Sequence, residues 1–167
     1  GIGCDANSLE AIDRVHKIKG IEQKKPFSVM MADLSMVEEY CETGIWEDII
    51  LKKYLPGPYT FLLKNKGMCA ASSNEKLGIR IPDSGFCQTI CRKLGRPIVT
   101  TSANRTGTVP PARFEDIDKM VLDGADVAID SGPTKYGAPS VIIDLVDRKL
   151  IRQGEEEIAL TSFEGME

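Results

Sequence analysis

The chain has 167 residues, which is enough for one compact domain with a sizeable hydrophobic core. It carries 21 Lys and Arg residues against 25 Asp and Glu residues, a net charge of −4, so it lacks the strongly basic composition typical of nucleic-acid-binding domains. Its uncharged apolar runs, for example within 126–130 and 140–144, are too short to span a bilayer, and no signal peptide is visible. We therefore expect a cytoplasmic protein without membrane association.

The first predicted element is an amphipathic helix. Apolar residues recur at helical spacing from Leu9 to Ile18, Ser8 is a good N-cap, and Gly20 is a good C-cap. After this helix the apolar pattern predicts, in chain order, a buried strand at 26–31, a helix at 35–41, a helix at 46–55 and a strand at 59–63.

The second half of the chain alternates in the same way. The pattern predicts a strand at 77–81, a helix after Ser84 with Phe86, Ile90 and Leu94 on its apolar face and Gly95 at its end, a strand at 97–101, a polar loop at 102–113, a helix at 114–122, and strands near Val127, Val141 and Leu150. This alternation predicts an α/β fold with a twisted mixed sheet. Because no linker or repeat is present, we expect one domain over residues 1–154 and an acidic C-terminal tail over residues 155–167.

Five cysteines and a single histidine limit the chemistry. Cys87 and Cys91 lie four residues apart, on one face of a predicted helix, but no second pair at zinc-ligand spacing accompanies them. We therefore interpret the cysteines as buried structural thiols in a reducing compartment. His16 is the only histidine, which argues against a catalytic triad or a histidine-based metal site. No pair of acidic residues stands out as a general acid and base, so catalytic residues cannot be assigned from the sequence.

The sharpest local signal is the end of the strand at 97–101. This strand runs into Ser102-Ala103-Asn104, at the kind of strand end where open α/β sheets bind ligands. Small side chains let a nucleotide approach the backbone, and Ser and Asn can donate to phosphate or sugar oxygens. A turn stabilised by its own Ser and Asn hydrogen bonds is equally consistent with these residues.

Two further signals are basic. Arg80 lies among apolar residues of the strand at 77–81, and its guanidinium is suited to bidentate capture of a carboxylate, unless it points to water from an edge strand. Lys19, Lys24 and Lys25 are a candidate for phosphate oxygens, or else a solvated surface. The chain has no Walker A loop and no G-x-G-x-x-G motif, so a phosphate site would have to be built in another way.

Taken together and in order, several segments resemble the YrdC-like domain family up to about Gly154. They are residues 1–6, 17–20 with 25–26, 56–61, 78–82, 101–104, 139–144 and 151–154. The resemblance implies a twisted α/β sheet around a concave cavity, an architecture shared with a riboflavin-pathway synthase. It also implies the synthesis of threonylcarbamoyl-AMP from L-threonine, bicarbonate and ATP, for transfer-RNA modification completed by a downstream threonylcarbamoyl transferase.

The resemblance also implies roles for particular residues. ATP would be bound by Lys19, Lys25, Ser102, Asn104 and Arg152, and L-threonine by Arg80, through its carboxylate, and by Ser140. Magnesium would be held largely by the nucleotide phosphates, so no dedicated metal site is expected. The attack of a carbamate on the α-phosphate needs positioning and charge neutralisation more than a proton shuttle, which fits a site without an obvious base.

The chain departs from the family pattern at three places. Ile21 stands where the Lys-x-Arg motif has its arginine, Pro110 stands where members often have a serine, and the Pro-Thr-x-Thr-x-Tyr strand expected immediately before Gly1 is absent from the sequence. The first departure is a feature of the YciO-like branch, whereas the complete Ser102-Ala103-Asn104 motif favours the synthases. If Ile21 faces the site, Ile21→Arg should strengthen ATP binding; if it packs inward, the arginine should cost stability.

Two alternative functions therefore stay open. One is a YciO-like relative that acts on a related adenylate. The other is a module that binds transfer RNA or double-stranded RNA without synthase activity, and the net negative charge argues against it.

Overall fold

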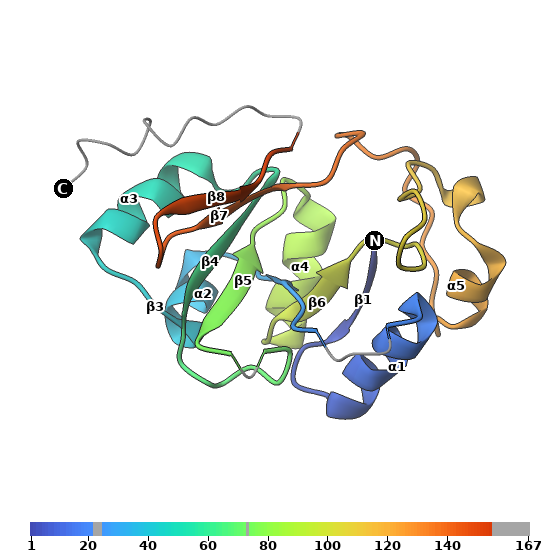
Figure 1. Ribbon diagram of the computed structural model, residues 1–167, viewed down its shortest axis with the longest axis horizontal. Coiled ribbons are helices and arrows are strands. Elements are labelled where there is room, and N and C mark those ends of the chain that lie inside the picture. The colour runs from blue at the N-terminus through green and yellow to red at the C-terminus, as the bar shows by residue number, and fades with distance from the viewer. Residues whose placement is uncertain (22–24, 73, 155–167) are drawn as a thin grey trace.

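The structure is a computed structural model that describes residues 1–21, 25–72 and 74–154, so the predicted acidic tail lies outside the described residues. The elements of its first half are β1 (Ile2–Asp5), α1 (Leu9–Lys19), β2 (Val29–Met30), α2 (Leu34–Tyr40), β3 (Cys41–Glu42), α3 (Ile45–Tyr54) and β4 (Tyr59–Asn65) (Figure 1). The second half contains β5 (Lys76–Arg80), α4 (Gly85–Leu94), β6 (Ile98–Thr101), the 3-10 helix η1 (Phe114–Asp116), α5 (Lys119–Asp123), β7 (Val141–Asp144) and β8 (Lys149–Arg152). The alternation of strands and helices confirms the predicted α/β class.

The strands form one mixed sheet. Their order across the sheet is β1-β6-β2-β5-β4-β7-β8, and β3 pairs with β4 away from this path. The pairs β2–β5 and β4–β7 are parallel, and the other pairs are antiparallel. The predicted twisted mixed sheet is therefore confirmed, and its order brings together strands that are distant in sequence.

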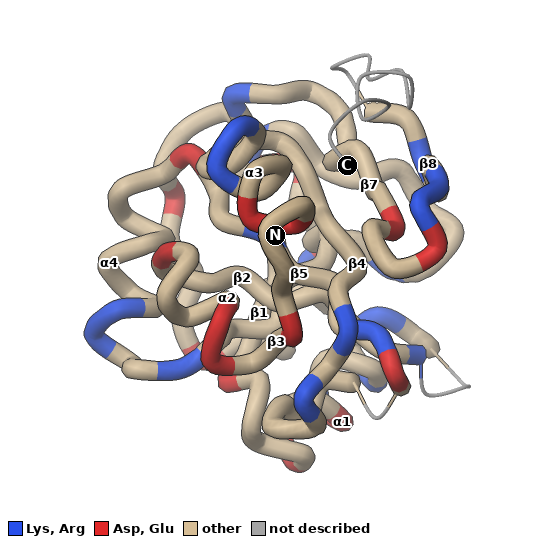
Figure 2. The backbone as a smooth tube through the Cα atoms, turned by 90° about the vertical axis from the view of Figure 1, so that its left-hand side faces the viewer, with Lys and Arg blue, Asp and Glu red and all other residues tan. Residues whose placement is uncertain are grey.

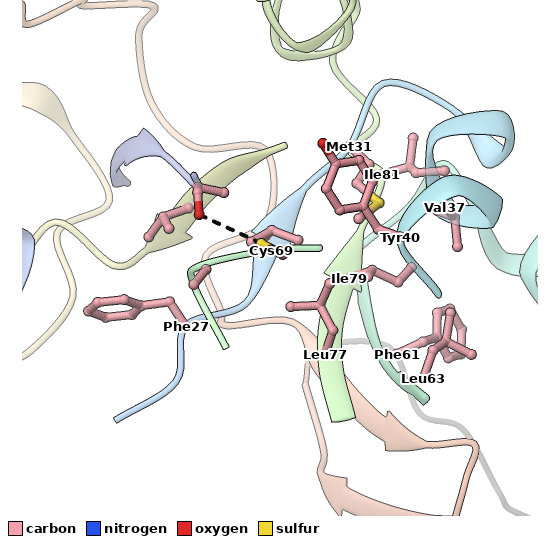
Figure 3. Close-up of a cluster of buried hydrophobic side chains, with 14 of the residues drawn as sticks. Phe27, Met31, Val37, Tyr40, Phe61, Leu63, Cys69, Leu77, Ile79 and Ile81 are labelled. Carbon is pink, nitrogen blue, oxygen red and sulfur yellow. Dashed lines mark hydrogen bonds between the residues drawn. The ribbon is translucent and has the colours of Figure 1, made fainter. Parts of the chain in front are cut away.

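The register assigns the side chains to two faces of the sheet. Val29 pairs with both Ile79 and Val99, and all three are fully buried in the main hydrophobic core. Since successive side chains of a strand alternate, Met30, Arg80 and Ile98 lie on the opposite face. Figure 3 shows part of the main core, where side chains from β4 and β5 meet those of α2.

The caps of α1 and α4 follow their sequence signals. Ser8 accepts a hydrogen bond from the backbone N–H of Ala11 at 3.2 Å, and Ser84 accepts one from that of Cys87 at 3.4 Å. Gly20 and Gly95 end the two helices with φ of 65° and 69°, in the left-handed region that favours glycine. The predicted starts and ends of both helices are confirmed.

Several predicted elements differ in the structure. The strand at 26–31 shrinks to Val29–Met30, and the predicted helix at 114–122 divides into η1 and α5 because Asp118 caps α5 instead of continuing a helix. The strand predicted near Val127 is wrong: no strand forms there, and the Val127 side chain is 75% exposed. The apolar face predicted for α4 is also wrong in part, since Phe86 is exposed whereas Cys91 is fully buried.

All five cysteines are free thiols. Cys41, Cys69 and Cys91 are buried, and burial raises the pKa of the Cys41 thiol to about 12 and that of Cys91 to about 11. Cys87 and Cys91 lie on one face of α4 and pack against the side chain of Met30. The interpretation of these residues as structural thiols is confirmed for the three that are buried.

The β7–β8 hairpin is held at its turn by charged side chains. Asp144 Oδ1 accepts hydrogen bonds from the backbone N–H groups of Val146 and Asp147, and Lys76 donates to both Asp144 and Asp147 at 2.7 Å. Arg148 adopts a φ of 50°, and its guanidinium lies 4.7 Å from the ring centre of Trp46 on α3. These contacts fix the hairpin, and therefore Arg152 at its end, against the rest of the sheet.

Candidate functional site

The first part of the site is a cluster around Arg80 on the face of the sheet opposite the main core. The register that pairs Phe61 with Ile79 places Thr60 beside Arg80. Thr60 is 2% exposed, and its hydroxyl lies 2.8 Å from that of Ser140 at the start of β7. Arg152 donates from Nη2 to the carbonyl oxygen of Ser140 at 2.8 Å and to its hydroxyl at 3.3 Å.

Arg80 is the charged residue of this cluster with an unused donor in the described part of the chain. Its Nε is buried, and no acceptor among the described residues bonds to it. Its pKa is lowered, first by burial, while the nearby Cys87 thiol opposes the shift and the charge of Arg152 adds to it. A half-buried guanidinium with an unused donor and a second cation nearby is suited to an anion such as a carboxylate.

A hollow of about 570 Å³ lies on the same face as Arg80. It is lined by Pro26, Phe27, Ser28, Leu62, Asn74, Glu75, Lys76 and Gly78. Gly78 is required for its shape, because a Cβ at this position would lie 2.6 Å from Ser28 Oγ and 3.2 Å from Leu62 Cδ2. The hollow lies two residues along β5 from Arg80, which does not line it.

The second part of the site is the segment that follows β6. Lys19, at the end of α1, is 6% exposed, and its Nζ donates to the carbonyl oxygens of Ser102 at 2.7 Å and of Asn104 at 2.8 Å. Burial lowers the pKa of this amine. Lys19 thus braces the Ser102–Asn104 segment and places a positive charge beneath it, while the side chain of Ser102 stays exposed.

The side chain of Asn104 is held within the loop by its own nitrogen. Nδ2 donates to the carbonyl oxygens of Arg105 at 3.0 Å and Thr108 at 2.5 Å, which leaves Oδ1 buried and without a donor among the described residues. The buried hydroxyl of Thr100, two residues before Ser102, also lacks a described partner. In this geometry Asn104 offers a bound molecule an acceptor, whereas the sequence-based interpretation had it donating to phosphate or sugar oxygens.

Lys25 and Ile21 flank residues 22–24, which lie outside the described residues. The side chain of Lys25 is exposed, and its carbonyl oxygen lies 3.0 Å from His16 Nε2. Ile21 is partly buried and packs against the main core. The inward alternative for Ile21 is therefore the one that the structure supports, and Ile21→Arg should cost stability.

The structure thus brings the predicted residues together in two groups. Arg80, Ser140 and Arg152 form one, and Lys19, Ser102 and Asn104 form the other. A second hollow, of about 760 Å³ near the start of α1 and the β4–β5 connection, contains none of the predicted residues, and the hollow beside Gly78 contains none of them either.

Sequence reasoning missed three residues of this site. Thr60 lies within the recognised 56–61 segment, but its contact with Ser140 depends on the pairing of β4 with β7. Gly78 precedes Arg80 by two residues, and this spacing places both on one face of a strand. The sequence could therefore have indicated that Gly78 lies beside Arg80. Nothing local distinguishes Thr100 from its neighbours, because its importance comes from the burial of its hydroxyl.

The family model of the Sua5/YciO/YrdC proteins, described as telomere recombination, matches residues 1–154. The chain belongs to this family. A protein of Methanocaldococcus jannaschii, named provisionally as a threonylcarbamoyl-AMP synthase, is 39% identical over 153 residues that cover 90% of this chain and 72% of the relative. A Bos taurus protein named threonylcarbamoyl-AMP synthase is 29% identical over 154 residues, covering 87% of this chain and 55% of the relative. The chain therefore spans only about half the length of some of its relatives.

Solved structures of the family share the fold. The chain superposes on P. abyssi Sua5 complexed with L-threonine with a TM-score of 0.81 at 24% identity, covering 91% of this chain and 46% of that one. It superposes on E. coli YciO with a TM-score of 0.82 at 25% identity, covering 95% of this chain and 80% of that one. Both branches considered from the sequence are thus represented among its structural neighbours.

Proposed function

We propose that this chain is a threonylcarbamoyl-AMP synthase domain that joins L-threonine, bicarbonate and ATP. One structural observation supports this proposal most strongly. Arg80, with an unused buried Nε, lies beside the Thr60–Ser140 hydroxyl pair on one face of the sheet, and the Lys19-braced loop follows a strand of the same sheet. The names of the M. jannaschii and Bos taurus relatives support the same activity.

The two groups of residues would divide the substrates between them. The guanidinium of Arg80 would pair with the carboxylate of L-threonine, and Ser140 would contact the same molecule. The Ser102–Asn104 segment would bind ATP, with Asn104 Oδ1 accepting from a hydroxyl or amino group of the nucleotide. Lys19 and Arg152 would supply positive charge to the phosphates. Each already donates to the backbone of a residue proposed to contact a substrate, since Lys19 bonds to the carbonyl oxygen of Ser102 and Arg152 to that of Ser140.

The reaction requires two steps. The amine of L-threonine and bicarbonate first combine into a carbamate with loss of water. A carbamate oxygen then bonds to the α-phosphorus of ATP, the bond from this phosphorus to the β-bridging oxygen breaks, and pyrophosphate leaves. The protein mainly has to position the two anions and neutralise their charges, and the basic side chains of the two groups can provide both.

Magnesium would enter this site with the nucleotide. Among the described residues no group of three or more His, Cys, Asp and Glu side chains is placed to hold a metal ion. We propose that Mg²⁺ is held by the phosphates of ATP, where it would neutralise charge on the oxygens of the transferring group.

The YciO-like alternative is favoured by one observation, the apolar Ile21 in place of the motif arginine, and by the similarity to E. coli YciO. RNA binding has less support. Figure 2 shows Lys and Arg positions interspersed with Asp and Glu positions along the backbone, and the chain has a net charge of −4. No described helix is both long and apolar enough to cross a bilayer. A cytoplasmic location and a downstream transferase acting on transfer RNA are part of the proposal.

Pyrophosphate release from ATP tests the proposal. The purified chain should release pyrophosphate and form threonylcarbamoyl-AMP only when L-threonine and bicarbonate are both present. Arg80→Met should raise the KM for L-threonine about ten- to a hundredfold, the equivalent of one charge-assisted hydrogen-bonded pair. The matched control is Arg92→Met, which removes an exposed arginine of α4 that pairs with Asp33 at 3.7 Å. Hydrolysis of an adenylate without threonine-dependent synthesis would favour the YciO-like function instead.

A further inference from the structure

Residues 132–140 connect the two groups of residues in the candidate site. This connecting segment forms neither helix nor strand, and it crosses from the side of α5 to the start of β7 (Figure 1, orange). Apart from Tyr136 and Ser140, all of its residues are exposed. Because the segment buries little apolar surface, its placement depends mainly on a few polar contacts.

One contact joins the connecting segment to the loop that follows β6. The backbone N–H of Thr134 donates to the carbonyl oxygen of Ala112 at 2.9 Å. Ala112 belongs to the same loop as Asn104, whose Nδ2 donates to the carbonyl oxygen of Thr108 at 2.5 Å. A displacement of the connecting segment would therefore act on the loop that is proposed to bind ATP.

A second contact joins the segment to the turn that follows Arg80. Lys135 Nζ donates to Asp83 Oδ2 and forms an ion pair with it. The turn is itself held, because the carbonyl oxygen of Pro82 accepts a hydrogen bond from the backbone N–H of Ser84 at 2.8 Å. Lys135 thus ties the connecting segment to a point three residues from Arg80.

The segment ends at Ser140, inside the group around Arg80. The hydroxyl of Ser140 lies 2.8 Å from that of Thr60, and its carbonyl oxygen accepts from Arg152 Nη2 at 2.8 Å. A molecule in contact with both Ser140 and Arg80 would order the end of the segment. The entropy cost of ordering a segment arises only once, so the ligand that orders it assists a second ligand at the other end.

We propose that the connecting segment couples the two substrates, so that L-threonine bound beside Arg80 strengthens the binding of ATP at the loop after β6. Lys135 is the positioning residue for this coupling, because it holds the segment against Asp83 without touching either substrate. This inference rests on the proposed function and extends it to a residue outside the two groups. The coupling is reciprocal, so ATP strengthens the binding of L-threonine by the same factor.

Titrations with α,β-methylene-ATP, with and without saturating L-threonine, test this proposal. The analogue cannot release pyrophosphate, so binding is measured without turnover. In the wild type, L-threonine should tighten binding of the analogue about fivefold or more. Lys135→Met should reduce this factor to about twofold or less, since an exposed ion pair changes an equilibrium by up to about fivefold. The affinity of Lys135→Met for each ligand alone should stay within about twofold of the wild type.

The matched control is Lys119→Met. It removes an exposed lysine that pairs with Asp123 at 2.7 Å within α5, and it should keep the wild-type coupling factor. Exchange of the charges tests the ion pair itself. Asp83→Lys places two ammonium groups side by side and should abolish the coupling, whereas the double variant Asp83→Lys with Lys135→Asp should restore it. Thermal unfolding of each variant shows that it is folded.

The outcomes distinguish this inference from the proposed function. If the wild type does not bind one of the two ligands, the proposed function and the coupling both fail. If it binds both without mutual effect, or if Lys135→Met keeps the full factor, the coupling alone is overturned. Equal losses of affinity with and without L-threonine would also overturn it, since they would show that Lys135 only stabilises the loop.

Discussion

Replacing Lys19 by methionine should lower the stability of the domain and release the Ser102–Asn104 segment. The amine of Lys19 is buried and donates to two carbonyl oxygens, those of Ser102 and Asn104. Methionine has nearly the same length and no donor, so packing is largely kept while both carbonyl groups lose their hydrogen bonds.

The expected loss follows from these two bonds. A hydrogen bond to a charged group contributes about 1.5–3 kcal/mol, so the pair would be worth about 3–6 kcal/mol in isolation. The ammonium is also desolvated, as the lowered pKa of Lys19 indicates. Replacing it by methionine removes this desolvation cost, which offsets part of the lost hydrogen-bond energy. We expect a net decrease of about 2–3 kcal/mol in the free energy of unfolding, or a fall in Tm of about 5–10 °C for a domain of this size.

Equilibrium urea denaturation followed by circular dichroism measures this change. The matched control is Lys17→Met, because Lys17 lies in the same last turn of α1 with its side chain exposed. The control removes the same charge from the same helix end and should change stability by less than about 0.5 kcal/mol. If Lys19→Met is as stable as Lys17→Met, Lys19 does not brace the segment, and the account of the site given above is wrong.

Three further changes test other parts of the structure. Gly78→Ala should cost about 1–3 kcal/mol in unfolding free energy, because the new Cβ meets the side chains of Ser28 and Leu62, whereas Gly85→Ala, with nothing within 4 Å, should not. Thr60→Val should cost about 1 kcal/mol by removing the hydrogen bond between the Thr60 and Ser140 hydroxyls, and should raise the KM for L-threonine; an unchanged KM would remove Thr60 from the site. The pKa of Asp147 is lowered from 3.8 to about 2, first by the hydrogen bond from Lys149 and then by that from Lys76. The contribution of Asp147 to stability is therefore present above pH 3.8 and lost as the pH falls through about 2. Asp147→Asn should therefore lower the urea midpoint at about pH 5 and match the wild type near pH 2; a constant difference would contradict this.

The helices were the most predictable part of the fold because their signals are local. Ser8 and Gly20 cap α1 through contacts within one turn, and Ser84 and Gly95 do the same for α4. Which side of α4 would be buried was less predictable, since it depends on the part of the sheet that the helix meets. Met30 of the sheet packs against the face of α4 that carries the two cysteines, so Phe86 is left exposed.

Strands were less predictable because a strand needs a neighbour. The apolar alternation around Val127 is typical of a strand, yet no described segment pairs with it, and it stays irregular. The site has the same dependence. Arg80 and Ser102 could be identified from local composition, whereas the contact of Thr60 with Ser140 requires the β4–β7 pairing, which joins residues 80 positions apart.

The stacking of Arg148 on Trp46 provides the protein with a built-in optical probe. Trp46 is the only tryptophan of the chain, so fluorescence excited at the indole comes from one known place on α3. Its emission depends on the guanidinium above the ring, and that guanidinium belongs to the turn of the hairpin that ends in Arg152. A ligand that displaced Arg152, and with it this hairpin, would therefore change the emission of Trp46 in the unlabelled protein. The spectrum of Arg148→Gly would give the emission of Trp46 without the stacked guanidinium.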